Sequence, residues 1–313
     1  IFFLVVFPVL IIPVVITGIN YVTSRGEARD TISDINRSWG LLEEKAYSLN
    51  QILLSWSAWD ELHTFMEEPN SQFIEQNFDN SGLISLDINS QIILDNNQNL
   101  IYYKNIDLKS GQDTSLPFEI QELWLKYPIL LEHDNPTSSH VGLLTMGENI
   151  ILAASRPIIT GSYEGPIQGT LIFLVFFTPD QLAGISSLVQ RQIRVEVVDD
   201  EIWSKLSTSA TFSSDELKDD LTSKITGQDI SETHDTIHTN WLVREENSYV
   251  KPIDQDTITG FQRMQDLNHE NRIFLQVISP RDLHHLGILT KVTFCFLIEL
   301  LGLLLFTIIQ PFA

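Results

Sequence analysis

The stretch ISDINRSWGLLEEKAYSLNQILLSW, residues 32–56, decides the fold. Its apolar residues recur at alternating steps of three and four, which is the a/d pattern of a long helix. Twenty-five residues at 1.5 Å each make this helix roughly 37 Å long. Two interpretations stay open: the seam packs on its own domain, or it joins two copies in a parallel homodimer. The seam residues are Ile32, Ile35, Trp39, Leu42, Ala46, Leu49, Leu53 and Trp56.

An apolar run precedes this helix. Ile1–Val22 carries no charged residue and matches the ~20 residues that a helix needs to cross the hydrocarbon core. Pro8 and Pro13 bend such a span without excluding it. A signal peptide is the alternative, but its apolar region is usually 7 to 15 residues and precedes a small-residue cleavage site, which is missing here. We therefore expect a transmembrane helix over residues 1–24.

A second apolar run closes the chain, interrupted by Lys291 and Glu299. It predicts a transmembrane helix over residues 288–310. We expect a two-pass protein of the cell membrane in contact with lipid, with residues 25–287 extracytoplasmic. Because the chain starts without Met and stops just past this run, we also expect a fragment whose cytoplasmic output module lies outside it.

Glu299 is an ionisable group in the middle of the second run. A lone ionised carboxylate at this depth costs several kcal/mol, so Glu299 is expected to face another helix or to be protonated. Counted inward from Arg25 and Lys291, Thr17 and Glu299 lie at the same depth. The sequence predicts that Glu299 faces Thr17 or Asn20, with a gap or its own symmetry mate as the alternative.

The composition narrows the class of partner. The chain carries 41 acidic against 19 basic residues, a net charge of -22, which argues against nucleic acid. The single cysteine, Cys295, lies in the second apolar run, which excludes a disulfide framework and a thiolate metal site. His234 and His238 flank Asp235 without a third ligand in view, so no metal site is predicted.

Catalytic motifs are missing as well. The chain has no Gly-rich phosphate loop, nucleophile elbow or His-Glu-x-x-His run. We expect no cofactor and no enzymatic activity in the visible chain. A full-length protein with kinase or cyclase activity would carry it beyond Ala313.

The region after the long helix, which we place at residues 25–66, turns to strand patterns. Polar turns separate apolar segments, and one helix interrupts them. The order is typical of a PAS-like antiparallel sheet and predicts a membrane-distal sensor module at residues 67–190. The expected strands are Leu83–Ile88, Ile92–Leu94, Leu100–Tyr103, Val141–Met146, Ile150–Ala154 and Thr170–Phe177, and the expected helix runs through Leu116, Ile120, Leu123 and Leu130.

A similar order follows on a smaller scale. A helix from Thr178 to Gln190 leads into it, with Pro179 at its first turn. The pattern predicts a membrane-proximal α/β module at residues 191–284. The chain is thus expected to be α+β, with two stacked PAS/Cache-like modules between two transmembrane helices. The expected elements are strands at 193–198 and 239–250, a helix at 214–225, and a pair of strands at 260–267 and 272–278.

Five fragments in order carry a family resemblance. They are Trp-x-x-Trp-Asp at 56–60, Leu-Asp-Ile-Asn at 86–89, Gly-Leu-Leu at 142–144, Ala-Ser-Arg-Pro-Ile at 154–158 and Gly-Pro-Ile-Gln-Gly-Thr-Leu at 165–171. Together they resemble the fourth class of CHASE domains, from about Leu41 to about Leu182, and Ile278–Asp282 is similar to that family too. These are extracellular sensor domains of prokaryotic histidine kinases and cyclic-dinucleotide enzymes. Members often carry Gly-Arg where this chain has Val175-Phe176-Phe177, so a contact by that arginine is not expected here.

The resemblance implies a ligand site between the sheet and the helices. Its candidate residues are Trp56, Trp59 and Asp60 from the long helix, and Tyr103 and Arg156 from the sheet. Asp60 would share a helix face with Trp56 and accept a hydrogen bond from a ligand. Arg156 would pair with a ligand carboxylate or with Asp60 itself. An aromatic core plug with a structural aspartate is the alternative.

The expected function is an extracytoplasmic ligand-sensing region of a transmembrane receptor. An unknown small molecule would bind, and the second membrane helix would transmit its presence to a histidine kinase or diguanylate cyclase module. Two alternatives stay open: a receptor that senses an envelope protein, and a structural membrane protein without signalling output.

Overall fold

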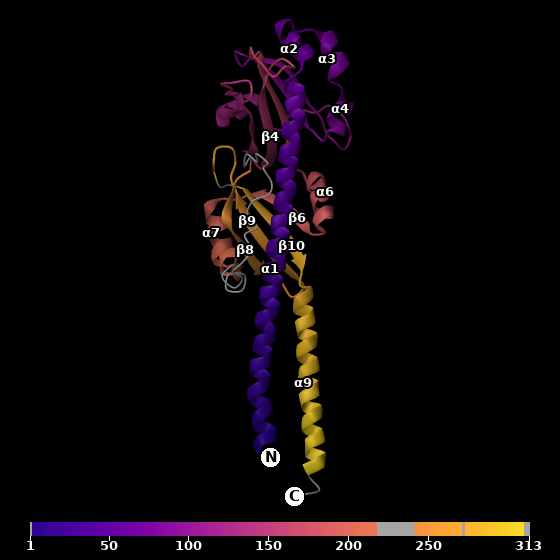
Figure 1. The fold of residues 1–313 in the computed structure, drawn as a ribbon, viewed down its shortest axis with the longest axis vertical. Coiled ribbons are helices and arrows are strands. Elements are labelled where there is room, and N and C mark those ends of the chain that lie inside the picture. Colours follow the sequence, from indigo (N-terminus) through magenta and orange to yellow (C-terminus); the bar gives the residue numbers. More distant parts are fainter. Residues whose placement is uncertain (1, 218–241, 271–272, 310–313) are drawn as a thin grey trace.

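The computed structural model describes residues 2–217, 242–270 and 273–309. One helix, α1 (Phe2–Ser57), runs without a break through both prolines and forms the axis of the molecule. Two sheets stack along it, and both ends of the chain lie at the same end of the molecule (Figure 1). His234 and His238 fall outside the described residues.

The helix ends nine residues earlier than the expected 25–66. The Ser57 carbonyl accepts a hydrogen bond from the Ile159 N–H at 2.9 Å, and Ala58 forms a parallel bridge with Ile159. Trp59 is extended, and the chain restarts as the short helix α2 (Asp60–Glu67). The expectation that Asp60 shares a helix face with Trp56 is therefore wrong, because a strand end takes up the last turn of α1.

The distal sheet contains five antiparallel strands in the order β2-β1-β5-β4-β3. The predicted hairpins and the third apolar strand are confirmed. The strands are β1 (Ser90–Asp95), β2 (Leu100–Asn105), β3 (His140–Met146), β4 (Asn149–Ile158) and β5 (Gly169–Phe176).

Two predictions in this region are wrong. The stretch Leu83–Ile88 is not a strand: α3 (Ser71–Asn77) and α4 (Asn80–Ser85) precede β1, and the Asp79 side chain caps α4 by accepting from the Gly82 N–H. The single helix expected through Leu130 is split into α5 (Ile120–Lys126) and the 3-10 turn η1 (Pro128–Leu131). Pro128 lacks the N–H that would continue α5.

The proximal sheet has the order β6-β10-β9-β8-β7 and is also antiparallel. The predicted pairing of the last two strands is confirmed. Of the helix expected at 214–225, residues 214–217 are helical and the rest lies outside the described residues, as does the start of the strand expected at 239–250. The elements are α6 (Pro179–Val189), β6 (Gln192–Val197), α7 (Asp200–Thr208), β7 (Phe212–Ser213), β8 (Arg244–Pro252), β9 (Thr257–Met264) and β10 (Ile273–Pro280).

The seam of α1 packs on the sheets of its own chain. Ile35, Leu42, Ala46 and Leu53 are fully buried, in one apolar cluster that also holds residues of both sheets. The interpretation that the seam packs on its own domain is confirmed, and a dimer seam through these residues is wrong. A second cluster, under α5 and η1, covers the other face of the distal sheet.

The last helix, α9 (Asp282–Ile309), runs beside the first part of α1 (Figure 1). Gly26 of α1 lies against Leu283, and Gly287 lies against Thr23. Within the described residues, the segments Val9–Ser57 and Asp282–Leu304 each contain a stretch long and apolar enough to cross a membrane.

The predicted contact of Glu299 is wrong. Asn20 accepts a hydrogen bond from Lys291 Nζ at 2.6 Å, and the Thr17 hydroxyl donates to the Pro13 carbonyl at 2.7 Å. Glu299 is exposed on α9, without a hydrogen bond to the described part of the chain. Lys291 lies level with Asn20. Glu299 therefore lies two turns deeper, about 12 Å beyond Asn20 and about 8 Å beyond Thr17.

Candidate functional site

At the far end of the molecule from the termini, the loop of residues 160–166 is fastened to α2. Asp60 Oδ1 accepts a hydrogen bond from the Gly161 N–H at 2.7 Å, and His63 Nε2 lies 3.2 Å from the Pro166 carbonyl oxygen. Asp60 itself is exposed. Its contact thus fixes the loop that follows β4, the strand that carries Arg156.

Arg156 is the unusual group of this region. It is 9% exposed, and its Nε donates to Asn50 Oδ1 of α1 at 2.8 Å, an oxygen that also accepts from the Ser139 hydroxyl. Burial lowers the pKa of the Arg156 guanidinium, and nearby Tyr163 opposes this shift. Arg156 forms no ion pair with the described residues, so the alternative in which it pairs with Asp60 is wrong.

Neutral polar groups surround this arginine. His133 lies between the Ser138 and Ser155 hydroxyls, each 2.9 Å from one of its ring nitrogens. Burial, together with the nearby His140 and Arg156, lowers the pKa of His133 to about 3. His133 is therefore uncharged at neutral pH, and Arg156 has no counter-charge among the described residues.

Trp56 and Trp59 belong to an aromatic cluster between α1 and the distal sheet. Trp56 meets the Phe173 ring edge-on, with the ring centroids 5.8 Å apart, and stacks on Phe78. Trp59 lies 6.5 Å from Trp56 and packs on Phe73. Both indoles are half-buried, so the cluster forms the cover of this face of the sheet.

Tyr103 lies on the opposite face of the sheet. Its hydroxyl accepts from the Leu116 N–H at 2.9 Å, and its ring packs with the second apolar cluster. The neighbouring Tyr102 instead stacks on Phe78, and burial raises its pKa to about 12. Successive residues of a strand face opposite sides of the sheet, so only one of the two tyrosines of β2 can lie on the face that Trp56 covers. The sequence alone could have shown that Tyr102 and Tyr103 do not share a site.

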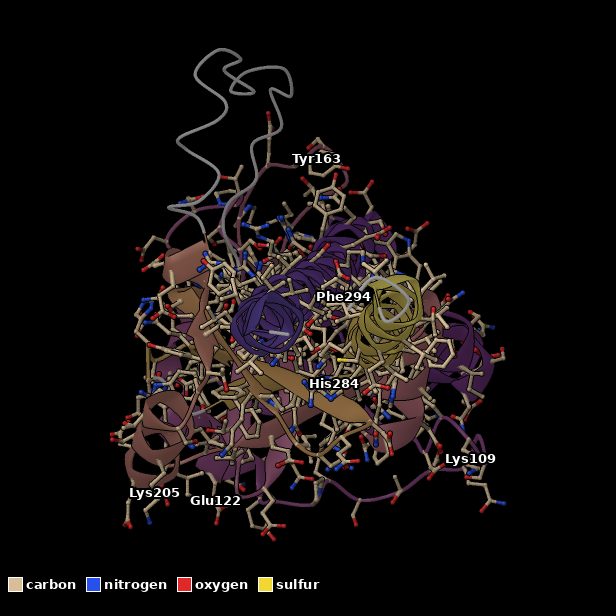
Figure 2. All side chains as sticks on the ribbon, turned by 90° about the horizontal axis from the view of Figure 1, so that it is seen from below. Lys109, Glu122, Tyr163, Lys205, His284 and Phe294 are labelled. Atoms are coloured by element: carbon tan, nitrogen blue, oxygen red, sulfur yellow. The ribbon has the colours of Figure 1, made fainter. Side chains whose placement is uncertain are left out.

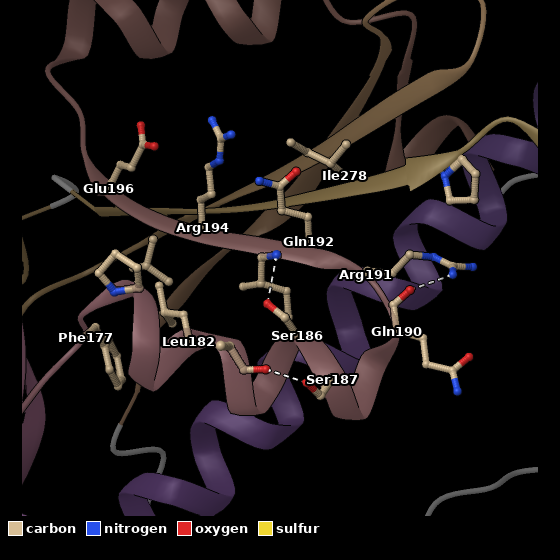
Figure 3. A pocket seen from close by; sticks show the side chains of 15 residues that line it. Phe177, Leu182, Ser186, Ser187, Gln190, Arg191, Gln192, Arg194, Glu196 and Ile278 are labelled. Carbon is tan, nitrogen blue, oxygen red and sulfur yellow. Dashed lines mark hydrogen bonds between the residues drawn. The ribbon is translucent and has the colours of Figure 1, made fainter. Parts of the chain in front are cut away.

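Three open grooves bear on the candidate site. One of about 950 Å³ lies between α6 and β6, where Arg194 and Glu196 project from the edge strand (Figure 3). A groove of about 400 Å³ lies between α1, α6 and the turn after α4. A shallow one of about 450 Å³ lies beside Asp60 and Phe73.

The α6 groove adjoins a buried ion pair between α1 and the proximal sheet. Asp34 of α1 accepts from Arg191 Nε at 2.7 Å and from the Ser279 hydroxyl at 3.0 Å, and it pairs with Arg37. One carboxylate thus joins α1 to the start of β6 and the end of β10. Sequence patterns alone did not identify the role of this residue, because its partners Arg191 and Ser279 are far away in the chain.

A second buried carboxylate links the two apolar helices. Glu27 of α1 is 4% exposed; its Oε2 accepts from Arg281 Nη2 at 3.1 Å, and its Oε1 accepts from the His284 N–H at 2.7 Å. His284 lies close to both long helices (Figure 2). Glu27 therefore caps the N-terminus of α9 from another helix, where a negative charge is favourable.

Two stacked antiparallel sheets on one helix, with apolar helices side by side at one end, define a mixed α and β architecture. Residues 41–196 match the model of the CHASE4 domain. Over this stretch the chain belongs to the CHASE4 family.

One curated relative supports the same class. The chain is 28% identical over 131 residues to the methanogenesis regulatory histidine kinase FilI of Methanothrix harundinacea (strain 6Ac). The match covers 42% of this chain and 15% of that protein, so the chain spans a small part of its relative.

Two solved sensor domains are also similar. The periplasmic domain of Vibrio cholerae LuxQ shares 13% identity at a TM-score of 0.47, covering 80% of this chain and 99% of that one. The sensor domain of the V. cholerae histidine kinase DctB shares 16% identity at a TM-score of 0.42, covering 83% and 98%.

Proposed function

We propose that this chain is the extracytoplasmic ligand-sensing region of a transmembrane receptor, crossing the membrane at both ends. The membership of residues 41–196 in the CHASE4 family supports a sensor role. The two apolar helices at one end of the molecule support the topology. Their target is a cytoplasmic output module of the kind found in histidine kinases, the class of the curated relative.

The ligand of this sensor carries an anionic group, most simply a carboxylate. The observation that carries this proposal is Arg156, a mostly buried arginine that forms no ion pair with the described residues although the chain has a net charge of -22. A buried charge without a partner is costly, and a planar guanidinium matches a carboxylate with two parallel hydrogen bonds. Asp60 would act indirectly, by holding the loop that carries Tyr163.

Transmission follows from the contacts of α1. Asn50 on this helix touches Arg156, and Glu27 on the same helix caps α9. The two residues are about 35 Å apart along an unbroken helix. A ligand that pulls Arg156 away from Asn50 changes the position of α1 at one end and the cap of α9 at the other. A few kcal/mol of differential affinity suffice to shift two arrangements of this kind.

The test uses the full chain in lipid nanodiscs and its thermal unfolding. Acetate, succinate and benzoate are added to wild type, to Arg156→Met and to the control Arg194→Met, which removes an exposed arginine on β6. At least one carboxylate is expected to raise the melting temperature of wild type and of the control but not of Arg156→Met. If no carboxylate stabilises wild type, or if Arg156→Met responds equally, the anion site is wrong.

A further inference from the structure

Gln91 is a buried amide without a partner. It lies in β1, is 0% exposed, and neither its Oε1 nor its Nε2 has a hydrogen bond in the described structure. Leaving a buried polar group unsatisfied costs about 1 to 3 kcal/mol. Such groups are rare in folded proteins, and each requires a physical explanation.

The amide faces the aromatic cluster under α1. Gln91 pairs across the sheet with Phe173 on β5 and with Lys104 on β2. Phe173 meets the Trp56 ring, and Lys104 donates to the Phe78 carbonyl at 3.2 Å. Apolar and aromatic side chains thus surround the amide, and Lys104, the one charged cross-strand neighbour, has its own acceptor.

The 400 Å³ groove lies near this amide, although Gln91 does not line it. Its lining includes Val175, which lies two residues from Phe173 on the same face of β5 and is therefore a diagonal neighbour of Gln91. Asp87 lies at the edge of this groove, where it accepts hydrogen bonds from Lys45 Nζ at 2.5 Å and from Gln181 Nε2 at 2.7 Å. Asp87 also has a φ of 59°, a left-handed conformation that costs a non-glycine residue about 1 kcal/mol or more.

We propose that Gln91 is the recognition group of a second ligand site, for a neutral, planar aromatic molecule with an amide-type edge. A primary carboxamide or lactam presents a donor beside an acceptor, which matches both free atoms of the Gln91 side chain. Its ring would stack in the cluster of Trp56, Phe78 and Phe173. The ligand passes through the groove beside Val175, and the turn at Asp87 moves to admit it.

This site is separate from the anion site. Arg156 lies on β4 opposite Leu171, whereas Gln91 lies on β1 opposite Phe173, two strands and two residues away. Strand spacing and rise place the two Cα atoms roughly 12 Å apart. The inference does not rest on the proposed anion ligand, because a neutral molecule satisfies an amide and gains nothing from a guanidinium.

Benzamide is the probe, and toluene is the matched probe without an amide. Both are titrated calorimetrically into the full chain in nanodiscs. Benzamide is expected to bind wild type at least about tenfold more tightly than Gln91→Met, the loss expected for one or two hydrogen bonds. Gln91→Met without ligand is expected to melt at a higher temperature than wild type, because the unpaired amide is gone.

A second variant tests access without touching the amide. A Cβ added at Gly184, which lines the groove on α6, meets nothing within 4 Å, and the same holds for the control position Gly40 on α1. Gly184→Met is expected to weaken benzamide binding, and Gly40→Met is not. The proposal is overturned if benzamide does not bind wild type at millimolar concentration, if Gln91→Met binds it equally, or if a buried water alone satisfies the amide.

Discussion

The two sheets share one helix but differ in how four buried polar side chains, two in each half, are partnered. In the proximal half, Asp34 is paired with Arg191, and Glu27 is paired with Arg281. In the distal half, Arg156 has one neutral partner, and Gln91 has none in the described structure. Of these four groups, the two in the proximal half have a charged partner, and the two in the distal half have none among the described residues.

This difference separates two tasks. A buried ion pair whose partners come from different elements fixes their relative position, since removing one partner leaves an uncompensated charge. An unpaired buried group instead leaves free energy that a ligand can recover. We infer that the distal half is built to receive a ligand and the proximal half to hold the geometry through which α1 reaches α9.

The strongest test of this comparison asks whether the halves fold together. Leu42 is fully buried in the apolar cluster that spans both sheets. Leu42→Lys is expected to lower the free energy of unfolding by more than the ~2 to 5 kcal/mol of a truncation to alanine, because it also buries a charge. Both halves should lose structure in one transition, whereas Gln51→Lys, on the exposed face of α1, should change little.

The measurement is denaturant unfolding followed by hydrogen exchange in each half. Two separate transitions, with the proximal sheet retained in Leu42→Lys, would show that the halves are independent and that the shared core is not cooperative. If Leu42→Lys stays folded but converts a dimer into a monomer, the seam joins two copies after all.

The next test compares the two buried arginines. Glu27→Gln leaves Arg281 buried without its counter-charge and weakens the cap of α9, so we expect a loss of about 3 to 5 kcal/mol. Arg156→Met removes a charge that has no counter-charge among the described residues, so we expect unchanged or higher stability. The free energies of unfolding of both variants are measured in the same nanodiscs.

A double variant serves as the control. Glu27→Gln combined with Arg281→Met should recover part of the loss, because no unpaired charge remains. Equal destabilisation by Glu27→Gln and Arg156→Met would contradict the contrast between the halves.

Sequence patterns were sufficient for the elements with strong periodicity. The alternation of three and four steps located α1, and apolar runs between polar turns located β1 to β5. The prediction of a strand at Leu83–Ile88 was wrong because a short apolar run fits a strand or a helix equally well. The cap at Asp79 favours the helix. The predicted end of α1 was wrong because the helix stops where the Ile159 N–H bonds to the Ser57 carbonyl, a contact that no local pattern contains.

The candidate site could be predicted only in part. Trp56, Trp59 and Asp60 do lie around the end of α1, and Arg156 does lie on the face that α1 covers. Tyr103 was placed on the wrong face, since register across strands is a tertiary property. Gln91 and Glu27 could not be found, because pairing, or its lack, depends on residues far away in the chain.

The smallest expected effect is a change of stability with pH, caused by His133 beside Arg156 in the distal half. The pKa of His133 is lowered from 6.5 to about 3 in the folded protein, chiefly by burial. A depressed folded-state pKa contributes stability that is complete above pH 6.5 and is lost as the pH falls toward 3. The slope of stability against pH approaches ~1.4 kcal/mol per pH unit at most.

Between pH 7 and 5.5 we expect wild type to lose about 1 kcal/mol more than His133→Gln. His269→Asn, at an exposed position, should follow wild type. A carboxylate bound at Arg156 should reduce the difference, because it offsets the positive charge beside the imidazole. Parallel stability curves for wild type and His133→Gln would mean that His133 is solvated in the folded state, and that the distal half is less dry than its contacts indicate.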